Sequence, residues 1–382
     1  MRTIGIDLGT TNTVAATRGD VLPLKDTIGG ILPSIVAFPP NGTTLFGHPA
    51  RLRRGMDPKN TIYSAKRLMG ELPTSYAAQQ VAQNYPFDLG VHEDGTVAFQ
   101  TRAGTFSAQE IATLIVQHYC ATTNLTPEEM DAVVTVPAAF GPAQRTATRR
   151  ALRNAGMPEV RMVDEPIATA IAYLQRSNLR YGAVYDFGGG TFDFAILDCS
   201  NHPFRVIAHG GDPYLGGDDI DRGIAHWAAD RVMRAYGWDL GSDSQIFERL
   251  VVASESAKIA LSQTNDAVID IAEVDPAAPT QLASLRIDRQ RAWDITAGTI
   301  QRTFHVCDEV LREAGLRVDD LQAVFMAGGS TAFPGLAEHV QRYFGKRPRT
   351  DIPPMAAVAI GASFAAARPG LSEFLGEEHT NV

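Results

Sequence analysis

The sequence contains only three cysteines among 382 residues, and they are far apart, at Cys120, Cys199 and Cys307. No two of them form a CxxC pair, so the usual zinc motifs are excluded and a disulfide framework is not indicated. This cysteine usage fits a reducing compartment. We expect all three side chains to serve as small apolar residues of the core.

The sequence also lacks segments that bind polyanions or membranes. Its formal net charge of −9 comes without a concentrated basic run, so neither nucleic acid nor an anionic membrane is an expected partner. No apolar run approaches the roughly 20 residues that span a bilayer. Strand-like residues begin at Thr3, which leaves no room for a secretory leader, and we expect a cytoplasmic protein.

Two common phosphate-binding motifs are missing as well. The sequence has no GxxxxGK[ST] motif, because Gly345-Lys346 is followed by Arg347. No GxGxxG motif opens a helix after a strand. The P-loop and Rossmann interpretations are therefore weak.

Apolar strand segments alternate with helical segments, which is typical of an α/β protein. A predicted strand at 132–136 precedes a predicted helix at 143–154, and a predicted helix at 166–175 precedes a strand at 183–185. With 45% hydrophobic residues, a chain of this length buries more core than one compact unit needs. We therefore expect two lobes.

One sequence pattern occurs twice, half a chain apart. Ile4–Thr11 and Val184–Thr191 each consist of an apolar strand, an aspartate, a glycine turn and a threonine. The separation is much longer than the roughly 20 to 50 residues of a solenoid repeat. The repeat therefore indicates two duplicated lobes with a ligand between them.

The less regular segments suggest where each lobe is interrupted. We predict lobe I at 1–178 with an inserted subdomain at about 38–106, and lobe II at 179–355 with an insert at about 216–292 that is mostly helical and ends in a strand pair. An alanine-rich helix at 356–370 should return to lobe I, with Arg368-Pro369-Gly370 ending it. A short polar tail at 371–382 follows.

The two glycine turns predict a site for a magnesium nucleotide. Backbone N–H groups of such turns and threonine hydroxyls can hold phosphate oxygens. Asp7 and Asp186 would repel a polyphosphate unless a cation lies between, and magnesium suits such oxygen ligands. One turn alone would be read as an ordinary tight turn, whereas the two together favour phosphate binding. A third glycine cluster, Ala327–Thr331, would let the backbone approach a sugar or base.

Six motifs in order make the chain resemble the nucleotide-binding domain of the heat-shock protein 70 chaperones. They are residues 7–12, 134–137, 164–166, 186–193, 215–219 and 328–331. The resemblance covers nearly the whole chain, and further matches at 60–62, 66–68, 255–262 and 344–346 suggest a bacterial-type member. It implies an α/β protein with the actin-like ATPase fold, in which duplicated ribonuclease H-like lobes form four subdomains around a nucleotide cleft.

The resemblance implies catalytic roles for Lys66, Glu165, Asp186 and Asp193. Lys66 would reach the γ-phosphate and the attacking water, where transition-state charge develops. Glu165 and Asp193 would orient that water and the magnesium hydration shell, while Asp7 and Asp186 would hold Mg²⁺ mainly through water. The plain alternatives are a surface lysine and, for Glu165, an acid that meets a helix dipole.

The resemblance also implies a set of nucleotide-binding residues. These are Gly9, Thr10, Thr11, Asn12, Gly188, Gly189, Gly190, Thr191, Gly216, Gly217, Glu255, Lys258, Ser262, Gly328, Gly329 and Ser330. Those in 255–262 share one helix face because they are three and four residues apart, although a solvated amphipathic helix has the same pattern. Pro137 and Arg145 match the family's proline switch and relay arginine, which couple nucleotide state to a second domain. A strand terminator and an ordinary helix arginine are the alternatives.

Several positions depart from the family pattern. Ala332 replaces an arginine that stacks on adenine, Met355-Ala356 replaces an acidic pair, and Ala139 replaces an aromatic residue beside Pro137. We expect weaker binding of the adenine base and altered coupling between nucleotide state and a second domain. The chain also ends about twelve residues after Gly370, too few for the family's substrate-binding domain, which leaves a truncated chain and a stand-alone protein both open.

The combined expectation is an Mg²⁺-dependent protein that binds ATP and ADP and hydrolyses ATP slowly, with lobe closure as a switch in a chaperone-like system. Its expected partners are a J-domain co-chaperone, a nucleotide exchange factor or a separate substrate-binding chain. A nucleotide-gated binding module with little hydrolysis is the first alternative. A small-molecule kinase of the same fold is the second.

Overall fold

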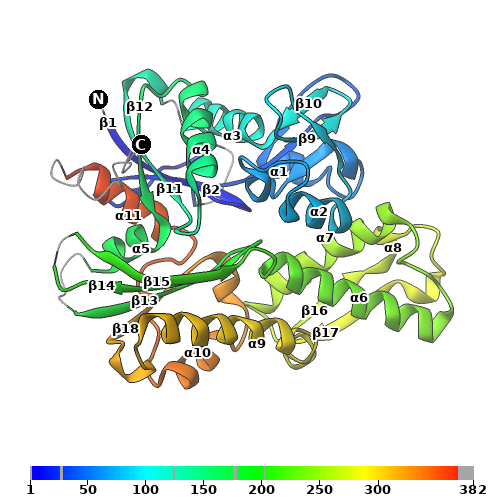
Figure 1. Cartoon of the computed structure of the whole chain (residues 1–382). Helices are drawn as coiled ribbons and strands as arrows, with labels where there is room; N and C mark the ends of the chain where they lie inside the picture. Colours follow the sequence, from blue (N-terminus) through cyan, green and yellow to red (C-terminus); the bar gives the residue numbers. More distant parts are fainter. Residues whose placement is uncertain (1, 26–28, 124, 175–178, 202, 369–382) are drawn as a thin grey trace.

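The computed structural model describes residues 2–25, 29–123, 125–174, 179–201 and 203–368. Two large β-sheets lie one above the other on the left of Figure 1, and a group of smaller elements extends to the right from each sheet. The predicted tail at 371–382, the helix stop at Pro369-Gly370 and Gln175 at the end of a predicted helix lie outside the described residues.

The upper sheet has six strands in the order β12-β11-β1-β2-β3, and β4 also pairs with β2. β1, β11 and β12 are parallel, whereas β2 is antiparallel to β1, β3 and β4. Every residue of β11 from 132 to 136 is buried, as expected for a parallel strand covered on both faces. The bounds are β1 (Arg2–Leu8), β2 (Asn12–Thr17), β3 (Asp20–Val21), β4 (Ile31–Pro33), β11 (Met130–Val136) and β12 (Glu159–Asp164).

The lower sheet repeats this plan with four strands in the order β15-β14-β13-β18. β13 pairs antiparallel with β14 and parallel with β18, as β1 pairs with β2 and β11. The prediction that one strand-turn-strand unit is used twice is therefore confirmed. The bounds are β13 (Tyr181–Phe187), β14 (Phe192–Asp198), β15 (Arg205–Asp212) and β18 (Ala323–Ala327).

The upper right-hand group contains two small sheets, β6-β5-β7 and β10-β9-β8. Its elements are β5 (Ile35–Ala37), β6 (Leu45–Phe46), α1 (Gly47–Arg51), η1 (Pro58–Asn60), β7 (Thr61–Tyr63), η2 (Ala65–Leu68), α2 (Tyr76–Asn84), β8 (Asp88–Val91), β9 (Val97–Thr101) and β10 (Gly104–Ser107).

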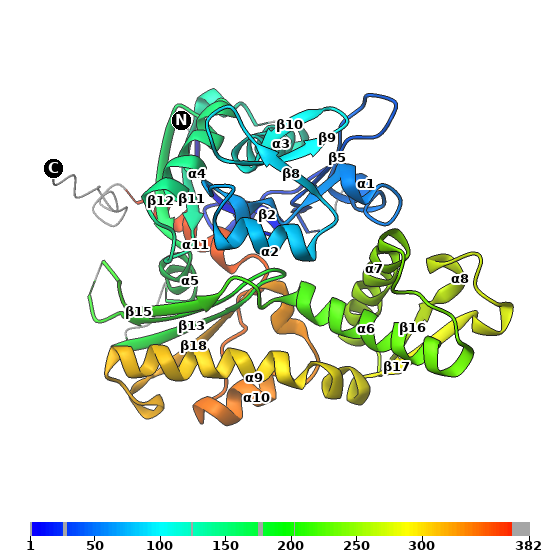
Figure 2. The same cartoon turned by 45° about the vertical axis from the view of Figure 1, so that its right-hand side comes forward.

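The lower right-hand group is mostly helical and ends in the antiparallel pair β16-β17, as its sequence predicted. Its elements are α6 (Gly217–Tyr236), α7 (Ser244–Leu261), β16 (Asp266–Asp270), α8 (Ile271–Val274), η4 (Thr280–Leu282) and β17 (Ser284–Asp288). Turning the molecule brings α7 forward, and α2 of the upper group lies above α6 (Figure 2). The lobe and insert boundaries stay predictions.

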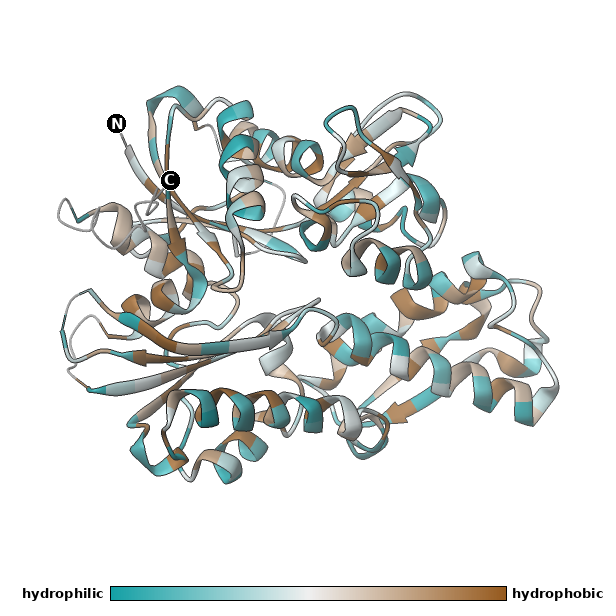
Figure 3. Ribbon diagram, viewed as in Figure 1, coloured by the Kyte–Doolittle hydropathy of each residue, from teal (hydrophilic) through white to brown (hydrophobic). Residues whose placement is uncertain are grey.

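The remaining helices cover the two large sheets. They are α3 (Ala108–Thr123), α4 (Pro142–Asn154), α5 (Glu165–Tyr173), α9 (Arg289–Ala314), α10 (Leu336–Phe344) and α11 (Ala357–Ala366), with short turns η3 (Pro127–Glu129), η5 (Val318–Asp320) and η6 (Gly329–Ala332). Hydrophobic residues concentrate on the strands, while the outer helices carry much of the hydrophilic colour (Figure 3). The predicted helix at 143–154 is confirmed as α4.

Helices α5 and α11 cross between the two large sheets, where α11 packs on β1 and β2 and α5 packs on β13 and β14. The crossing is unusually close, because a Cβ atom at Gly361 would lie 1.7 Å from the backbone oxygen of Ala168. A Cβ at Gly5 would likewise lie 2.1 Å from the backbone nitrogen of Ser363. The two halves of the molecule therefore meet through backbone that tolerates no larger residue.

The expected core role of the cysteines is confirmed, since Cys120, Cys199 and Cys307 are all buried and free. Burial raises the pKa of the Cys120 thiol to about 11 and that of Cys199 to about 12. Among the described residues, no helix combines the length and the apolar character that a membrane crossing requires.

We predict that Gly361→Ala destabilises the fold. The added methyl group has no space beside Ala168, and overpacking of this kind costs about 1–3 kcal/mol. Urea denaturation should show a lower free energy of unfolding. The matched control is Gly298→Ala inside α9, where a Cβ meets nothing within 4 Å and where alanine is favoured over glycine by about 0.5–1 kcal/mol. Equal effects of the two substitutions would contradict the close crossing.

Candidate functional site

A cavity of about 340 Å³ is lined by residues from both halves of the chain. The turns that follow β1 and β13 contribute to it, together with η2, the start of α5 and the turn after β18. Most predicted site residues are among its lining residues. They are Asp7, Gly9, Thr10, Thr11, Asn12, Lys66, Pro137, Glu165, Asp186, Gly188, Gly189, Thr191, Asp193, Gly328 and Gly329.

One ion pair stands at the base of the cavity. The Nζ atom of Lys66 lies 2.7 Å from Oε1 of Glu165, and both side chains are nearly buried. Glu165 is the first residue of α5, where the helix dipole favours a carboxylate. Lys66 lies in η2, whose preceding residue Ser64 has a left-handed φ of 54°. A serine held in this sparsely populated region indicates local strain at the entry to η2.

Three further carboxylates lie in the same cavity and carry raised pKa values. Burial, followed by repulsion from Glu165, raises the pKa of Asp7 to about 7 and that of Asp193 to about 7. The same two causes raise the pKa of Asp186 well above its ordinary value. Burial would lower the pKa of Lys66, but the carboxylates, Glu165 first, hold it above its ordinary value. These four carboxylates thus lie near one lysine, Lys66, which does not balance their charge.

The glycines of the turns allow the backbone segments around these carboxylates to lie close to one another. A Cβ at Gly189 would lie 2.1 Å from Oγ1 of Thr11, so the turns after β1 and β13 touch each other. Gly328 has a φ of 82°, and a Cβ there would lie 2.6 Å from Oδ1 of Asp186. Within the described part of the chain, the buried Thr11 hydroxyl has no hydrogen-bond partner. Its hydrogen-bonding capacity is therefore not used within the described part of the chain.

Three predicted residues, Gly216, Gly217 and Ser330, support the turn after β13, and neither they nor Gly190, which belongs to that turn, are among the cavity-lining residues. The backbone N–H of Gly217 donates to the Gly188 oxygen at 3.1 Å, and the Ser330 hydroxyl donates to the same oxygen at 2.8 Å. A Cβ at Gly216 would collide with the Gly189 oxygen at 2.5 Å. These residues hold the turn from behind.

The predicted face of α7 is engaged in contacts within the protein. Glu255 pairs with Arg51 at 2.7 Å. Lys258 pairs with buried Asp221 at 2.8 Å and donates to the Gly217 oxygen. The Ser262 hydroxyl donates to the Ile259 oxygen and is exposed. Glu255, Lys258 and Ser262 are not among the residues that line the cavity, and their nucleotide contacts stay predictions.

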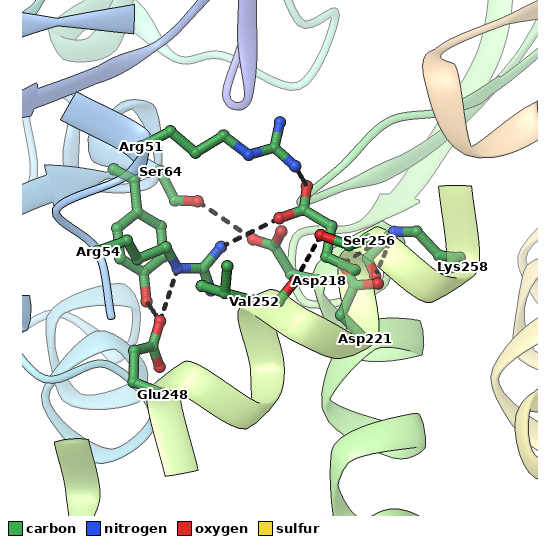
Figure 4. A network of polar contacts seen from close by, with 12 residues as sticks. Arg51, Arg54, Ser64, Asp218, Asp221, Glu248, Val252, Ser256 and Lys258 are labelled. Atoms are coloured by element: carbon green, nitrogen blue, oxygen red, sulfur yellow. Dashed lines mark hydrogen bonds and ion pairs between the residues drawn. The ribbon is translucent and has the colours of Figure 1, made fainter. Parts of the chain in front are cut away.

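A polar bridge joins the two right-hand groups of elements (Figure 4). Nε of Arg54 lies 2.6 Å from Oε1 of Glu248, and the Tyr63 hydroxyl donates to the same oxygen at 2.7 Å. The Ser64 hydroxyl donates to Asp218 at 3.2 Å. The Arg54 and Glu248 side chains are only 7% and 4% exposed, so this pair is a buried charge contact.

The predicted coupling residues, Pro137 and Arg145, lie near the cavity and near the start of α5 respectively. Pro137 lines the cavity. Arg145 donates from Nε to the Phe140 oxygen at 2.8 Å and pairs through Nη2 with Asp164 at 2.8 Å. Because Asp164 directly precedes Glu165, Arg145 helps to set the start of α5.

Several lining residues were not selected from the sequence. They are Arg67, Glu71, Tyr76, Ala77, Phe140, Gln144, Gly211, Asp212, Pro213, Tyr214, Pro354 and Val358. Arg67 directly follows Lys66, and the sequence indicated it only as part of the motif around that lysine. The others come from segments without a motif, so their sequence carries no signal of the cavity. Ala139 and Met355, noted as departures from the family pattern, also line it.

Comparison with known proteins decides the family. The family model described as Hsp70 protein matches residues 3–369. A curated relative, the "Chaperone protein HscA homolog" of Acidithiobacillus ferrooxidans, is 38% identical over 369 residues, which cover 95% of this chain and 58% of the relative.

The chain belongs to the Hsp70 family. Membership of the Hsp70 family confirms the resemblance seen in the sequence and shows that the fold is the actin-like ATPase fold. Hsp70 proteins as a family are ATPases that bind ATP or ADP with Mg²⁺. Nucleotide binding by this chain is therefore supported at the level of its family. The chain spans somewhat more than half the length of the curated relative that it matches.

We predict that Arg54→Met destabilises the protein by about 3 kcal/mol, because it removes the closest cation of the buried Glu248 carboxylate and leaves only the longer contact of 3.8 Å to Arg222. Urea denaturation of the nucleotide-free protein measures the effect. Arg234→Met is the matched control, since Arg234 pairs with Asp230 on an exposed helix face and such pairs contribute little. A loss no larger than that of the control would contradict a buried bridge.

We also predict a pH dependence from Asp193. A folded pKa of about 7, above the ordinary 3.8, means that folding favours the protonated acid, so its stabilising contribution is lost as the pH rises from about 4 through 7. The measurement compares the thermal midpoints of the wild type and Asp193→Asn in buffer without nucleotide or divalent ions. As the pH is raised from 5 to 8, the midpoint of the wild type should decrease relative to that of Asp193→Asn. Parallel curves would show that Asp193 does not titrate in this range. Asp230→Asn, on an exposed face of α6, provides the control.

Proposed function

We propose that this Hsp70-family chain binds Mg-ATP in the cavity and hydrolyses it slowly to ADP and phosphate. One observation carries the proposal: the cavity brings together both Asp-Gly-Thr turns and the Lys66–Glu165 ion pair. No single turn would support it. Their convergence from opposite halves of the chain supports a ligand that carries several phosphates.

The residues fit such a ligand. The unpartnered Thr11 hydroxyl, Thr10 and the glycines of both turns would donate to phosphate oxygens. Crowded carboxylates with raised pKa values need a cation, and hard oxygen ligands suit magnesium. Among the described residues no three His, Cys, Asp or Glu side chains are arranged to ligate a metal directly. We therefore assign Asp7 and Asp186 to holding Mg²⁺ through its water ligands.

Hydrolysis in this cavity would rest on positioning and electrostatics. The Lys66 ammonium group would lie where negative charge develops on the transferred phosphoryl group, and Glu165 keeps its Nζ atom in place. Glu165 and Asp193 would orient the attacking water and accept its hydrogen bonds. A bound magnesium ion would offset phosphate charge. These roles account for four of the six carboxylates that line the cavity.

Nucleotide state would be passed on by closure of the two halves. The Arg54–Glu248 bridge and the Arg51–Glu255 pair join the upper and lower right-hand groups of elements, so their distances would change as the two halves move. Arg145, through Asp164, would connect the start of α5 to the segment that carries Pro137. A chaperone-like role with a J-domain co-chaperone, an exchange factor or a substrate-binding chain is part of this proposal, in view of the HscA-type relative.

A nucleotide-gated binding module with little hydrolysis is the second candidate. It is favoured by the apolar edge of the cavity, where Met355 is 41% exposed and packs within about 3.5 Å of a Cβ built at Gly329. Ala332 at the end of η6 is exposed as well. Neither side chain can hold a base by charge or hydrogen bonding, and weak base contacts suit a switch more than efficient turnover.

We predict that Lys66→Ala lowers the single-turnover rate of ATP hydrolysis about 100-fold or more, because it removes a cation from the site of transition-state charge. ADP affinity, measured by calorimetry, should change far less. Lys59→Ala is the control, since Lys59 is 64% exposed in a surface pair with Asp88.

The same assay separates the candidates. A wild-type protein that binds ATP but hydrolyses it no faster than Lys66→Ala would favour the binding module. A wild-type protein that shows no ATP binding would overturn both.

A further inference from the structure

A buried serine, Ser34, lies behind the turn that follows β1. It is only 5% exposed and is not among the residues that line the cavity. Two of its groups hold the turn. Its hydroxyl donates to the Gly9 oxygen at 2.9 Å, and its backbone N–H donates to the Thr11 oxygen at 2.8 Å. One residue thus holds both ends of the segment Gly9–Thr11.

The pairing of the strands places Ser34 at this point. β4 runs antiparallel to β2, with Pro33 opposite Asn12. The next residue along β4, Ser34, therefore comes level with Thr11, the last residue before β2. Because this register belongs to the sheet, the contact between Ser34 and the turn is built into the upper half of the molecule.

The hydroxyl groups behind the turn form a short chain of hydrogen bonds. The Oγ atom of Ser34 also lies 2.9 Å from Oγ1 of Thr13, which is fully buried. A carbonyl oxygen can only accept, so the single hydroxyl hydrogen of Ser34 goes to Gly9, and the Thr13 hydroxyl donates to Ser34. Hydrogen bonds linked in this way polarise one another. Thr13 therefore strengthens the bond from Ser34 to the turn.

These bonds set the direction in which the turn presents its N–H groups. In a planar trans peptide unit the C=O and the N–H point in opposite directions. Because the Gly9 oxygen points to Ser34, the N–H of Thr10 points to the other side of the turn, which borders the cavity. The Thr11 oxygen directs the N–H of Asn12 in the same way. A phosphate in the cavity would then meet donors instead of carbonyl oxygens.

The turn after β13 has the same arrangement. Gly188 takes the place of Gly9 in the repeated sequence pattern, two residues after the aspartate. Its oxygen accepts from the Ser330 hydroxyl at 2.8 Å and from the Gly217 N–H at 3.1 Å. Both halves of the molecule thus use a serine from a distant segment to bind the carbonyl of the same glycine. This recurrence favours a role for the serines in shaping the turns.

Packing gives the first turn little support from behind. Gly9, Thr10 and Ser34 border a second, much smaller cavity of about 10 Å³, which residues of η2 and α3 also line. Its volume is enough for about one water molecule. The hydrogen bonds of Ser34 therefore do what tightly packed side chains would otherwise do for the turn.

We propose that Ser34 is a positioning residue for the phosphates of the nucleotide, because it holds the turn Gly9–Thr11 with its N–H groups directed into the cavity. Ser34 does not contact the nucleotide and acts only through the turn. The inference rests on the proposed function and specifies how one of the two glycine turns is kept in shape for its ligand.

The test compares the wild type with Ser34→Ala, Ser34→Thr and Ser363→Ala. Threonine keeps the hydroxyl, and the small cavity beside Ser34 gives its methyl group space. Ser363→Ala is the matched control. Ser363 is a fully buried serine whose hydroxyl accepts from the Gly19 N–H, beyond the opposite end of β2, and donates to the Ile360 oxygen.

Four quantities are measured for each protein. Calorimetry gives the affinity for Mg-ADP, and equilibrium dialysis gives the affinity for adenosine, which has no phosphate. Mass spectrometry follows hydrogen exchange of the peptide that contains the turn, in protein without nucleotide. The thermal midpoint shows that each variant is folded and how much stability it has lost.

For Ser34→Ala we expect about a tenfold loss of Mg-ADP affinity, comparable to the contribution of one hydrogen bond. Its adenosine affinity should stay within about twofold of wild type, and the turn should exchange its amide hydrogens faster. Ser34→Thr should recover Mg-ADP affinity to within about threefold of wild type, because it keeps the donor. Ser363→Ala should lower the thermal midpoint and leave both affinities and the exchange of the turn unchanged.

The inference is wrong if either the Mg-ADP affinity or the amide exchange of Ser34→Ala matches the wild type. It is also wrong if adenosine and Mg-ADP lose affinity equally, or if Ser363→Ala loses as much Mg-ADP affinity, since both results indicate a general effect on the fold. Failure of Ser34→Thr to recover affinity would exclude the hydroxyl as the cause. In all these cases binding of Mg-ADP by the wild type leaves the proposed function standing. A wild type that binds no Mg-ADP would overturn the proposed function, and this inference with it.

Discussion

Four of the six carboxylates that line the cavity, Asp7, Glu165, Asp186 and Asp193, act on the ammonium group of Lys66, and the proposed chemistry depends on this excess of negative charge. Asp7, Asp186 and Asp193 cannot all ionise at low cost beside Glu165, because like charges repel strongly where water is excluded. Protons or a cation must relieve the repulsion. The raised pKa values of Asp7 and Asp193, both about 7, express this need, and under the proposed function a magnesium nucleotide meets it.

The fold brings these charges together by using one unit twice. In each large sheet an apolar strand carries an aspartate as its penultimate residue, and a glycine turn follows the strand. The two turns touch where Gly189 meets Thr11. The approach is possible because α5 and α11 cross at backbone contact, with Gly361 against Ala168. A larger residue at that crossing would move the two turns apart. The geometry of the cavity is therefore linked to a helix contact remote from it.

Arginines with different partners have different physical roles around the cavity. Arg54 is almost fully buried against Glu248, so its charge is compensated and its role is to join two groups of elements. Arg145 is tied to Asp164 and a backbone oxygen, which fixes the start of α5. Arg67 contacts only carbonyl oxygens and ring faces, and its charge stays available. The residue type alone does not distinguish these cases.

Much of the fold and part of the site followed from the sequence. The Asp7 and Asp186 turns and the strand before Gly328 rest on local patterns, because a glycine turn after an apolar strand needs only neighbouring residues to form. Lys66 and Glu165 were expected from the family resemblance, and only the structure shows their ion pair. The sequence could not place Glu255, Lys258 and Ser262, since partners on distant elements, Arg51 and Asp221 for the first two, determine where charged groups of α7 point.

Arg67, Tyr214 and the Arg54–Glu248 bridge likewise emerged only from the tertiary structure. Their contacts join residues more than a hundred positions apart, and no local pattern encodes such a distance. The sequence by itself determined the two glycine turns, the family and the fold. Only packing of the two halves decided which charges are neutralised and which remain free for a ligand, because burial and pairing depend on what the rest of the chain places beside each group.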